Sequence, residues 1–591
     1  MALVLYSITA CSPVERTEQQ SARALQAFYS EKLDSAIFHL EAIRDYARAA
    51  KPITMLQYRF TKSRYFYKQA EPVTEYFFQG LTKRINGPVL PDVKVEDGQV
   101  LPPRGYQVLE QFLFGQEPAP LDPLENEINV LINDLRYSKN QIGEIAIQKT
   151  HFKELVQHQI IRIATTGITG LDAPLSKQSI PEAAASLTGL SEMCKRYLGP
   201  KNPAFYADCA HAALYAMQHA DFDAFDRLFF ITKILAPLSN TFDQFYAVEK
   251  ASEAPKGAKF VAGNLHDLLR GEKLDANYFS PYKIAHSNPD KVALGKQLFF
   301  DKTLSKNGKI SCASCHRPEL AFTDGLKTAA NFPHGGSLPR NTPTLYYAGI
   351  QNSQFYDMRA NYLEDQIDDV MNSTNEFDLP GEQTKQRILD HPTYTEAFKK
   401  AFPESDSIDS YLVRNAIAAY VRSLAPFRSP FDRYLKGDTN ALSPEAAKGF
   451  NLFAGKAKCA TCHFIPVFNG TIPPWYNKTE SEIIGVPVAP VTRNAVIDPD
   501  PGRYAIHQLD ELTFAFKTPT VRNAALTAPY MHNGTYRTLE EVVEFYHLGG
   551  GSGIGIDLPG QSLPFDTLQL STPEKKALIA FIHALTDEVA K

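Results

Sequence analysis

The chain contains the pattern C-x-x-C-H twice, as Cys312-Ala313-Ser314-Cys315-His316 and Cys459-Ala460-Thr461-Cys462-His463. The two copies begin 147 positions apart (459 − 312 = 147). This pattern attaches c-type haem: both thiols add to the porphyrin vinyl groups, and the adjacent histidine reaches the iron. One C-x-x-C alone is also typical of a redox dithiol or half of a zinc site. A histidine directly after the second cysteine, twice in one chain, favours two covalent haems with His316 and His463 as proximal ligands.

The composition is that of an ordinary globular protein. Of 591 residues, 44% are hydrophobic and 21% are charged, which excludes wholesale disorder and a collagen-like chain. A net charge of −5 without a long basic run argues against a nucleic-acid binder. The length predicts roughly three to four domains. Seven cysteines are too few for a disulfide scaffold, and Cys194 and Cys209 are expected to be buried small side chains.

The N-terminus predicts export. Residues 2–10 are apolar or small, and Ile8-Thr9-Ala10-Cys11 is similar to a bacterial lipobox, in which Cys11 would be lipidated. The segment 1–10 is too short to cross a bilayer and lacks a basic region before it, so a plain apolar N-terminus is the alternative. Since haem c is attached outside the bacterial cytoplasm, we expect a periplasmic protein anchored by lipid to the outer or inner membrane.

Residues 11–250 show helical spacing of apolar residues and predict a helical bundle, followed by a connector at 251–290. The stretch Gly105-Tyr106-Gln107-Val108-Leu109-Glu110 resembles imelysin-like bundle domains, whose signature is G-x-H-x-x-E. Gln107 stands where that family has histidine, which argues against a metal site here. A packing or docking domain is the alternative interpretation.

From Ala293 on, the sequence resembles the bacterial dihaem cytochrome c peroxidase family, which includes the MauG-like enzymes. The resemblance implies an all-α protein with two cytochrome c-like haem domains after the bundle. The peroxidatic domain would span 291–438 and the electron-transfer domain 439–591. The matching stretches are Ala293–Asp301, Ile310–His316, Arg340–Leu345, Phe355–Arg359, Leu363–Gln366, Thr520–Asn523, Leu526–Gly534 and Thr538–Tyr546.

The resemblance places the catalytic side chains around the first haem. Cleaving peroxide requires a group that takes a proton from one oxygen and returns it to the other. By residue-for-residue match, Glu376 is this acid/base and Gln366 is its distal partner. Classical members also carry a distal histidine on a mobile loop, and His334, followed by two glycines, lies close to that place. Solvated polar side chains are the alternative for all three residues.

The second haem departs from the classical peroxidases. Fourteen positions after His532, where those enzymes have a distal methionine, this chain has Tyr546 (532 + 14 = 546), as in MauG-like members. A phenolate oxygen stabilises oxidised iron more than a thioether does and lowers its reduction potential. The alternatives are that Tyr546 is a core aromatic residue of a helix, or that Met531 is the ligand.

The resemblance implies two further sites between the two haems. Tyr356 occupies the place where the family generally has tryptophan, and the one tryptophan of the chain, Trp475, lies elsewhere. Tyr356 is thus expected to relay electrons. The family also binds calcium between its haem domains with an Asn side chain and two backbone carbonyls, oxygen ligands that suit Ca²⁺. The matching residues are Asn341, Thr527 and Pro529.

These observations predict a dihaem c-type cytochrome peroxidase that reduces H2O2 to water. Electrons would come from a donor protein such as a small cytochrome or a cupredoxin. One alternative is a MauG-like enzyme that uses peroxide to oxidise a protein or small molecule, favoured by Tyr546 and the missing tryptophan. Another is an electron-transfer or binding module without peroxidase activity. The oligomeric state stays open, with a homodimer as one option.

Overall fold

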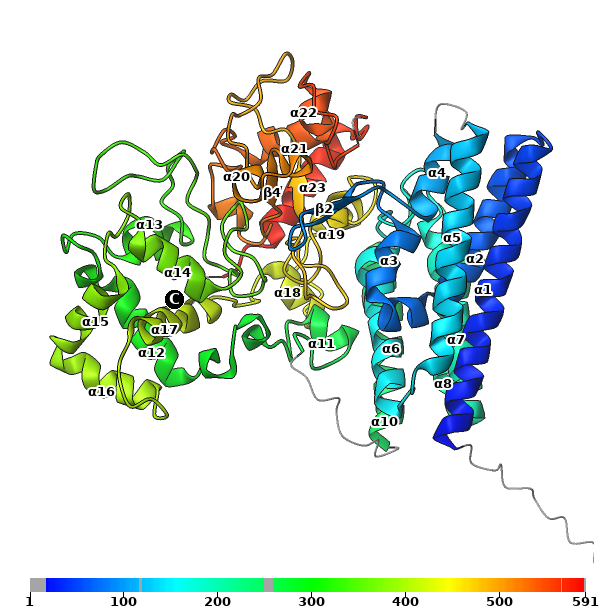
Figure 1. The fold of residues 1–591 in the computed structure, drawn as a ribbon, viewed down its shortest axis with the longest axis horizontal. Coiled ribbons are helices and arrows are strands. Elements are labelled where there is room, and N and C mark those ends of the chain that lie inside the picture. The colour runs from blue at the N-terminus through cyan, green and yellow to red at the C-terminus, as the bar shows by residue number, and fades with distance from the viewer. Residues whose placement is uncertain (1–16, 116–119, 249–258, 565, 589–591) are drawn as a thin grey trace, which may run out of the picture.

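The computed structural model describes residues 17–115, 120–248, 259–564 and 566–588, and Figure 1 shows two parts side by side. Long helices coloured blue to cyan form one part, and the half with the haem motifs, green to red, forms the other. The export segment 1–10 and Cys11 lie outside the described residues. None of the helices described here has the length and apolar character needed to cross a bilayer.

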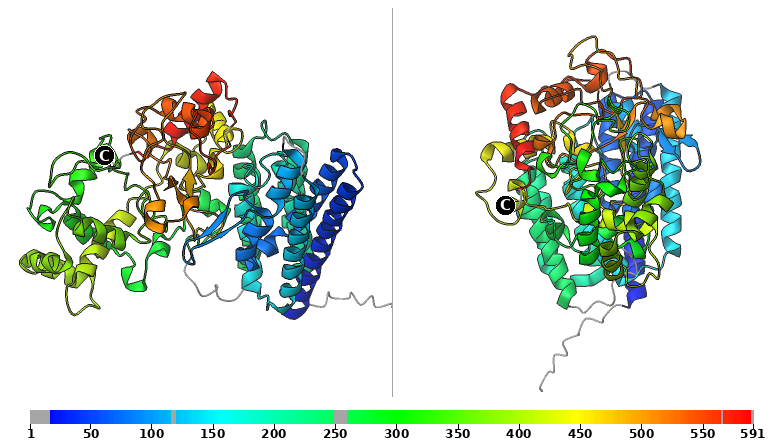
Figure 2. Two further views of the ribbon diagram at one scale, coloured as in Figure 1. Left: turned by 45° about the horizontal axis from the view of Figure 1, so that its top comes forward. Right: turned by 90° about the vertical axis from the view of Figure 1, so that its left-hand side faces the viewer.

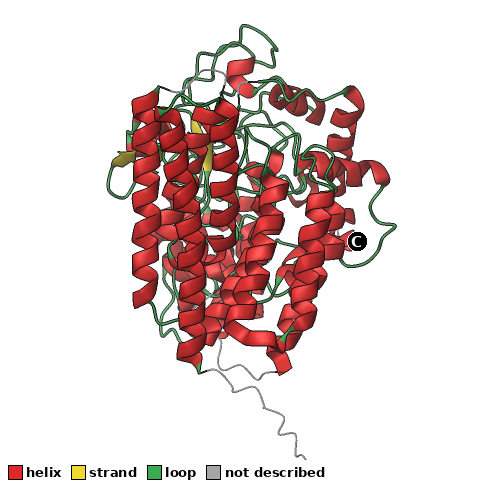
Figure 3. Cartoon of the chain, turned by 90° about the vertical axis from the view of Figure 1, so that its right-hand side faces the viewer, coloured by secondary structure: helices red, strands yellow, loops and turns green. Residues whose placement is uncertain are grey.

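The fold class is all-α, as predicted. Figure 3, which faces the bundle, shows helices and loops with very little strand. Two short antiparallel pairs make up the strands of the described residues. The first pair lies within residues 11–250, which the sequence predicts as a helical bundle. The pairs are β1 (Asp92–Lys94) with β2 (Gln99–Leu101), and β3 (Ser481–Ile483) with β4 (Ala515–Lys517).

The N-terminal bundle forms because each long helix carries an apolar stripe. Helix α1 begins with a capping box, in which Thr17 and Gln20 each satisfy the other's backbone N–H. Its residues Leu25, Phe28 and Leu33 are fully buried against the neighbouring helices. The bundle comprises α1 (Glu18–Arg48), α2 (Ile53–Phe77), α3 (Gln79–Asn86), α4 (Tyr106–Phe114), α5 (Leu121–Gln141), α6 (Lys149–Arg162), α7 (Ser179–Leu198), α8 (Pro203–Gln218), α9 (Arg227–Phe229) and α10 (Ala236–Val248).

Charged side chains are buried inside the bundle, and they neutralise one another. The Arg64 guanidinium lies 2.5 Å from the Glu182 carboxylate, and the Lys68 ammonium lies 2.6 Å from Asp172. Arg162 contacts the same Asp172 at 2.9 Å. Burying a charge costs free energy, and ion pairs with hydrogen bonds of this kind offset that cost. The cluster is therefore a closed ionic core of the bundle.

The imelysin-like stretch makes structural contacts. The Gln107 side chain donates to the Leu171 carbonyl at 2.9 Å, and Glu110 accepts from the backbone and hydroxyl of Ser176. Within the described part of the chain, no group of three or more His, Cys, Asp or Glu is arranged to hold a metal ion. These contacts fix α4 against the 171–176 loop, which fits the packing interpretation of this stretch.

The other half repeats one helix crossing in both haem domains. Helix α12 crosses α17 at Gly295, and α19 crosses α23 at Gly449. A Cβ at Gly295 would lie 1.8 Å from the Ala416 carbonyl oxygen, and one at Gly449 would lie 1.9 Å from that of Ala577. Only glycine allows such an approach. The helices of this half are α11 (Leu265–Leu269), α12 (Pro289–Phe300), α13 (Cys312–Cys315), α14 (Leu363–Asn372), α15 (Gly381–Leu389), α16 (Pro392–Ala401), α17 (Ser410–Arg422), α18 (Pro430–Leu435), α19 (Pro444–Phe453), α20 (Tyr504–His507), α21 (Leu539–His547), α22 (Gly550–Gly553) and α23 (Thr572–Ala584).

The bundle shares its hydrophobic core with the second haem domain. Phe450, Phe468 and Phe581 of that domain belong to the same buried cluster as the bundle residues, whereas most of the core of the first haem domain forms a separate cluster. The order across the molecule in Figures 1 and 2 is first haem domain, second haem domain, bundle. The bundle is thus built onto the second haem domain rather than tethered beside it.

The helix crossing in the second haem domain gives a stability prediction. Replacing Gly449 by Ala forces α19 away from α23, and we expect a loss of about 1–3 kcal/mol in the free energy of unfolding. Chemical denaturation of the full chain measures this change. The matched control is Gly80→Ala in α3, where a new Cβ meets open space. There the better helix propensity of alanine is expected to raise stability by up to about 1 kcal/mol. An equal effect of both substitutions would contradict the close crossing.

Candidate functional site

The first C-x-x-C-H motif forms one tight turn. Helix α13 begins with a capping box at Ser311, and the backbone N–H of His316 donates to the Cys312 carbonyl at 2.9 Å. The Nδ1 atom of His316 lies 3.0 Å from the Phe322 carbonyl oxygen. Nδ1 therefore carries the proton, which leaves Nε2 free to bind a metal. Burial lowers the pKa of His316, so the ring stays neutral.

The second motif repeats this arrangement. The turn Cys459–Thr461 leads into His463, whose Nδ1 lies 3.0 Å from the Pro519 carbonyl and 3.2 Å from that of Phe468. Burial lowers the pKa of His463 to about 4. The four motif thiols form no disulfide, and neither do the buried Cys194 and Cys209. Each motif thus offers two free thiols and a neutral imidazole with an available Nε2, which is the donor set that haem c requires.

A large, mostly apolar cavity lies against the second motif. Cys459, Cys462 and His463 line it together with Phe453 and Leu578, and it extends toward the first haem domain. A flat apolar macrocycle suits such a lining. The cavity also collects predicted site residues from distant parts of the chain. These are Gln366, Tyr356, Tyr546, Met531, Asn341, Thr527 and Pro529.

Glu376 and His334, predicted for the first haem site, do not line this cavity, and neither does the first motif with Cys312, Cys315 and His316. Glu376 lies on the turn after α14 and is half-buried, and burial raises its pKa. Its charge acts on the nearby Cys315 thiol. His334 is exposed, and its Nε2 lies 3.1 Å from the Thr374 carbonyl oxygen, two residues before Glu376. The His334 loop therefore rests on the turn that carries Glu376.

Tyr546 lies on α21 in contact range of the second motif. Burial is the main cause that raises the pKa of its phenol, and the neighbouring Cys462 and Glu482 add to it. Glu482, on β3, lines the same cavity and hydrogen-bonds Cys462, and burial raises its pKa to about 7. Sequence reasoning missed Glu482 because it belongs to a polar run, Lys478 to Glu482, that is typical of a solvated surface.

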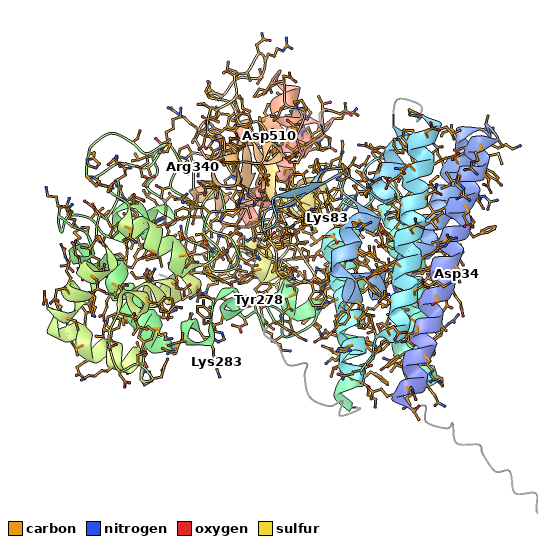
Figure 4. All side chains as sticks on the ribbon, in the orientation of Figure 1. Asp34, Lys83, Tyr278, Lys283, Arg340 and Asp510 are labelled. Carbon is orange, nitrogen blue, oxygen red and sulfur yellow. The ribbon has the colours of Figure 1, made fainter. Side chains whose placement is uncertain are left out.

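The contact between the two haem domains surrounds Tyr356. Its hydroxyl lies 3.5 Å from the Asn341 side-chain oxygen, and its backbone carbonyl accepts from Lys517 in β4 at 2.7 Å. Arg340, labelled in Figure 4, forms a bidentate pair with Asp500 of the second domain at 2.6 and 2.9 Å. It also contacts Asp357 of the first domain at 2.5 Å. Arg340 thus joins the two haem domains close to Tyr356.

Two cytochrome-like domains, each with a complete haem-attachment motif, define a protein of the di-haem cytochrome class. The model of the di-haem cytochrome c peroxidase family matches residues 289–440. The methylamine utilization protein MauG of Methylorubrum extorquens is 33% identical over 323 residues, 54% of this chain and 85% of that protein. The chain therefore belongs to the di-haem cytochrome c peroxidase family, as the sequence predicts, and is an oxidoreductase of the dihaem peroxidase type.

Two further relatives carry peroxidase names. A cytochrome-c peroxidase named IdrP1 from Pseudomonas sp. (strain SCT) is 35% identical, over 52% of this chain and 84% of its own. The cytochrome c551 peroxidase of Nitrosomonas europaea is 36% identical, over 44% of this chain and 74% of its own. Each relative aligns with about half of this chain.

The Arg340 bridge gives a prediction about how the two haem domains are joined. Replacing Arg340 by Gln leaves Asp500 without its cation, and we expect a loss of about 1–3 kcal/mol, less than for a fully buried pair because Arg340 is partly exposed. The midpoint of the first urea unfolding transition measures it. Arg359→Gln is the matched control, since the ion pairs of Arg359 among the described residues are with Asp357 and Asp369 of its own domain. A similar loss in both variants would contradict a special role of Arg340.

Proposed function

We propose that this protein reduces H2O2 to water with two covalently attached haem c groups. Cys312, Cys315 and His316 would hold the peroxidatic haem, and the second motif would hold the electron-transfer haem. When bound, haem iron would supply the redox centre at which peroxide is reduced. The observation that carries the proposal is the repeated donor set: in both motifs Nδ1 of the histidine is engaged by backbone carbonyls and Nε2 is free.

Glu376 acts as the acid/base of peroxide cleavage in this proposal. Its raised pKa suits a group that takes a proton and returns it near neutral pH. Gln366 assists as a hydrogen-bonding partner of the bound peroxide. The His334 loop, with Gly335 and Gly336 in left-handed conformation and open space around them, has the freedom that a displaceable distal ligand requires.

Tyr356 carries electrons from the side of His463 to the side of His316. It lines the cavity that begins at the second motif, and its hydroxyl faces Asn341. Asn341 donates through Nδ2 to the Leu326 carbonyl, so its oxygen points away from that contact. This oxygen, with the Thr527 and Pro529 carbonyls, is our proposed Ca²⁺ site between the domains.

Tyr546 would coordinate the iron of the second haem in this proposal, and Met531, which lines the same cavity, is the rival donor. A phenolate ligand lowers the reduction potential and thereby favours the second candidate function. In that function the enzyme is MauG-like and uses peroxide to oxidise a protein or small molecule. The peroxidase proposal ranks first because relatives named as peroxidases share the haem half with this chain.

The enzyme also has proposed domain bounds, a proposed location and proposed partners. We propose residues 11–250, 291–438 and 439–591 as its three domains, with 251–290 as connector. Attachment of haem c requires a periplasmic location, and lipidation at Cys11 would anchor the chain to the membrane. The electron donor is a small redox protein of the cytochrome or cupredoxin type, and a homodimer is one option for the assembly.

Replacing Glu376 by Gln tests the acid/base role. We expect the rate of peroxide reduction to fall by about a hundred-fold or more, because glutamine cannot accept the proton. In the wild type, Glu376 must be ionised to act as base, so the rate rises with pH through a pKa above the ordinary 4.5, and this limb disappears in the variant. The matched control is the exposed Glu382→Gln. A variant that keeps full peroxide reduction would contradict this role of Glu376, whereas a wild type that does not turn over peroxide would favour the electron-transfer interpretation.

Replacing Tyr546 by Met tests the ligand of the second haem. A thioether stabilises oxidised iron less than a phenolate, so we expect one of the two midpoint potentials to rise in a redox titration. The control is Tyr536→Phe, in the same small buried cluster as Tyr546. Unchanged potentials in the Tyr546 variant would make Tyr546 a core aromatic residue and leave Met531 as the candidate.

A further inference from the structure

The single tryptophan of the chain lies at the contact between the second haem domain and the bundle. The Trp475 indole N–H donates to the Glu75 carbonyl in α2 at 3.4 Å. Its ring centroid lies 5.4 Å from that of Tyr76 in α2 and 4.4 Å from that of His158 in α6. A haem-domain residue is thus held between two aromatic rings of the bundle.

A short chain of bonds connects Trp475 with the second haem motif. Ile465 follows His463 by two residues, and its carbonyl accepts a hydrogen bond of 2.9 Å from the Tyr476 hydroxyl. Tyr476 is also the covalent neighbour of Trp475 in the sequence. The connection from His463 to the indole therefore consists of covalent bonds and one hydrogen bond.

At the far end of this connection, the Tyr76 phenol can release its proton to a carboxylate. The Tyr76 hydroxyl donates to the Glu154 carboxylate at 2.5 Å, and Lys259 pairs with the other oxygen of that carboxylate. Burial raises the pKa of Tyr76 to about 12, so its phenol is protonated at neutral pH. A phenol that loses an electron also loses its proton, and Glu154 is in position to accept it.

We propose that Tyr76 and Trp475 relay electrons from a one-electron donor protein at the bundle to the second haem. This proposal rests on the proposed peroxidase function and adds the route by which electrons enter. Each electron leaves Tyr76 through Trp475, and the phenol proton moves to Glu154. The donor then returns one electron to Tyr76, and the proton returns from Glu154. Two such transfers, with two protons from solvent, reduce one H2O2 to two H2O.

The surroundings of Trp475 suit electron transfer. Burial lowers the pKa of His158 to about 4, so the ring beside the indole is neutral and does not oppose loss of an electron. Tyr76 is only half-buried, so the bundle end of the relay is within reach of a docked donor. Tyr278, labelled in Figure 4 at the junction, donates to the Trp475 carbonyl at 3.4 Å and helps to fix this segment.

The test uses the full haem-loaded chain treated with H2O2 in the absence of a donor. Without a reductant the relay itself must give up an electron, and we expect an organic radical in the EPR spectrum of the wild type. Trp475→Phe and Tyr76→Phe should lose the tyrosyl signal. Glu154→Gln removes the proton acceptor and should change it to a tryptophanyl signal. The matched control Tyr58→Phe, an exposed tyrosine of the same helix, should keep the wild-type spectrum.

A second measurement separates this proposal from the proposed function. Peroxide turnover with a small-molecule reductant bypasses the bundle, and the relay variants should retain it. If the wild type shows no such turnover, the peroxidase function is wrong. If turnover is present but the radical is unchanged in Trp475→Phe and Tyr76→Phe, the relay is wrong. Because Trp475 is the only tryptophan, its fluorescence reports whether the contact stays intact in Tyr76→Phe and Glu154→Gln.

Discussion

Both haem motifs depend on one hydrogen-bond arrangement, in which a histidine Nδ1–H donates to backbone carbonyls and leaves Nε2 unprotonated. For His463 one acceptor, Pro519, lies 56 residues further along the chain. The orientation of the ring is therefore fixed by the whole domain and not by the C-x-x-C turn alone. The close helix crossings at Gly295 and Gly449 matter for the same reason, since they close the domains that bring these carbonyls to the imidazoles.

The sequence predicts what is locally encoded. Two thiols and an imidazole must meet one rigid macrocycle, so their spacing is short and readable at Cys312 and Cys459. Helix caps such as Thr17 with Gln20 are local as well. The family resemblance also predicts Tyr356 and Tyr546 as site residues. Both line one cavity although 190 positions separate them (546 − 356 = 190). The contact between bundle and haem domain had no such signal, because it depends on apolar surfaces formed only after folding.

Arg227 shows how that contact is made. Its guanidinium is fully buried and donates to the carbonyls of Ile168, Phe222 and Phe225, and no carboxylate of the described residues is in hydrogen-bond contact with it. Burial accordingly lowers its pKa to about 10. The guanidinium lies against Gly455, where a Cβ would come within 2.4 Å of it. Burying a charge costs free energy unless its hydrogen bonds are satisfied, and here three carbonyls of the bundle satisfy them at the boundary with the second haem domain.

At this boundary, bundle residues pack against the second haem motif. The π-helical turn Ile163–Gly167 of the bundle packs against the turn Cys459–Thr461, and Asn451 bonds to Asp226 and Leu228. A redox partner that approaches the motif from this side therefore meets bundle residues first. Since the two parts share one hydrophobic core, removing the bundle would expose apolar surface of the haem domain. The bundle is thus a structural component of the second haem domain.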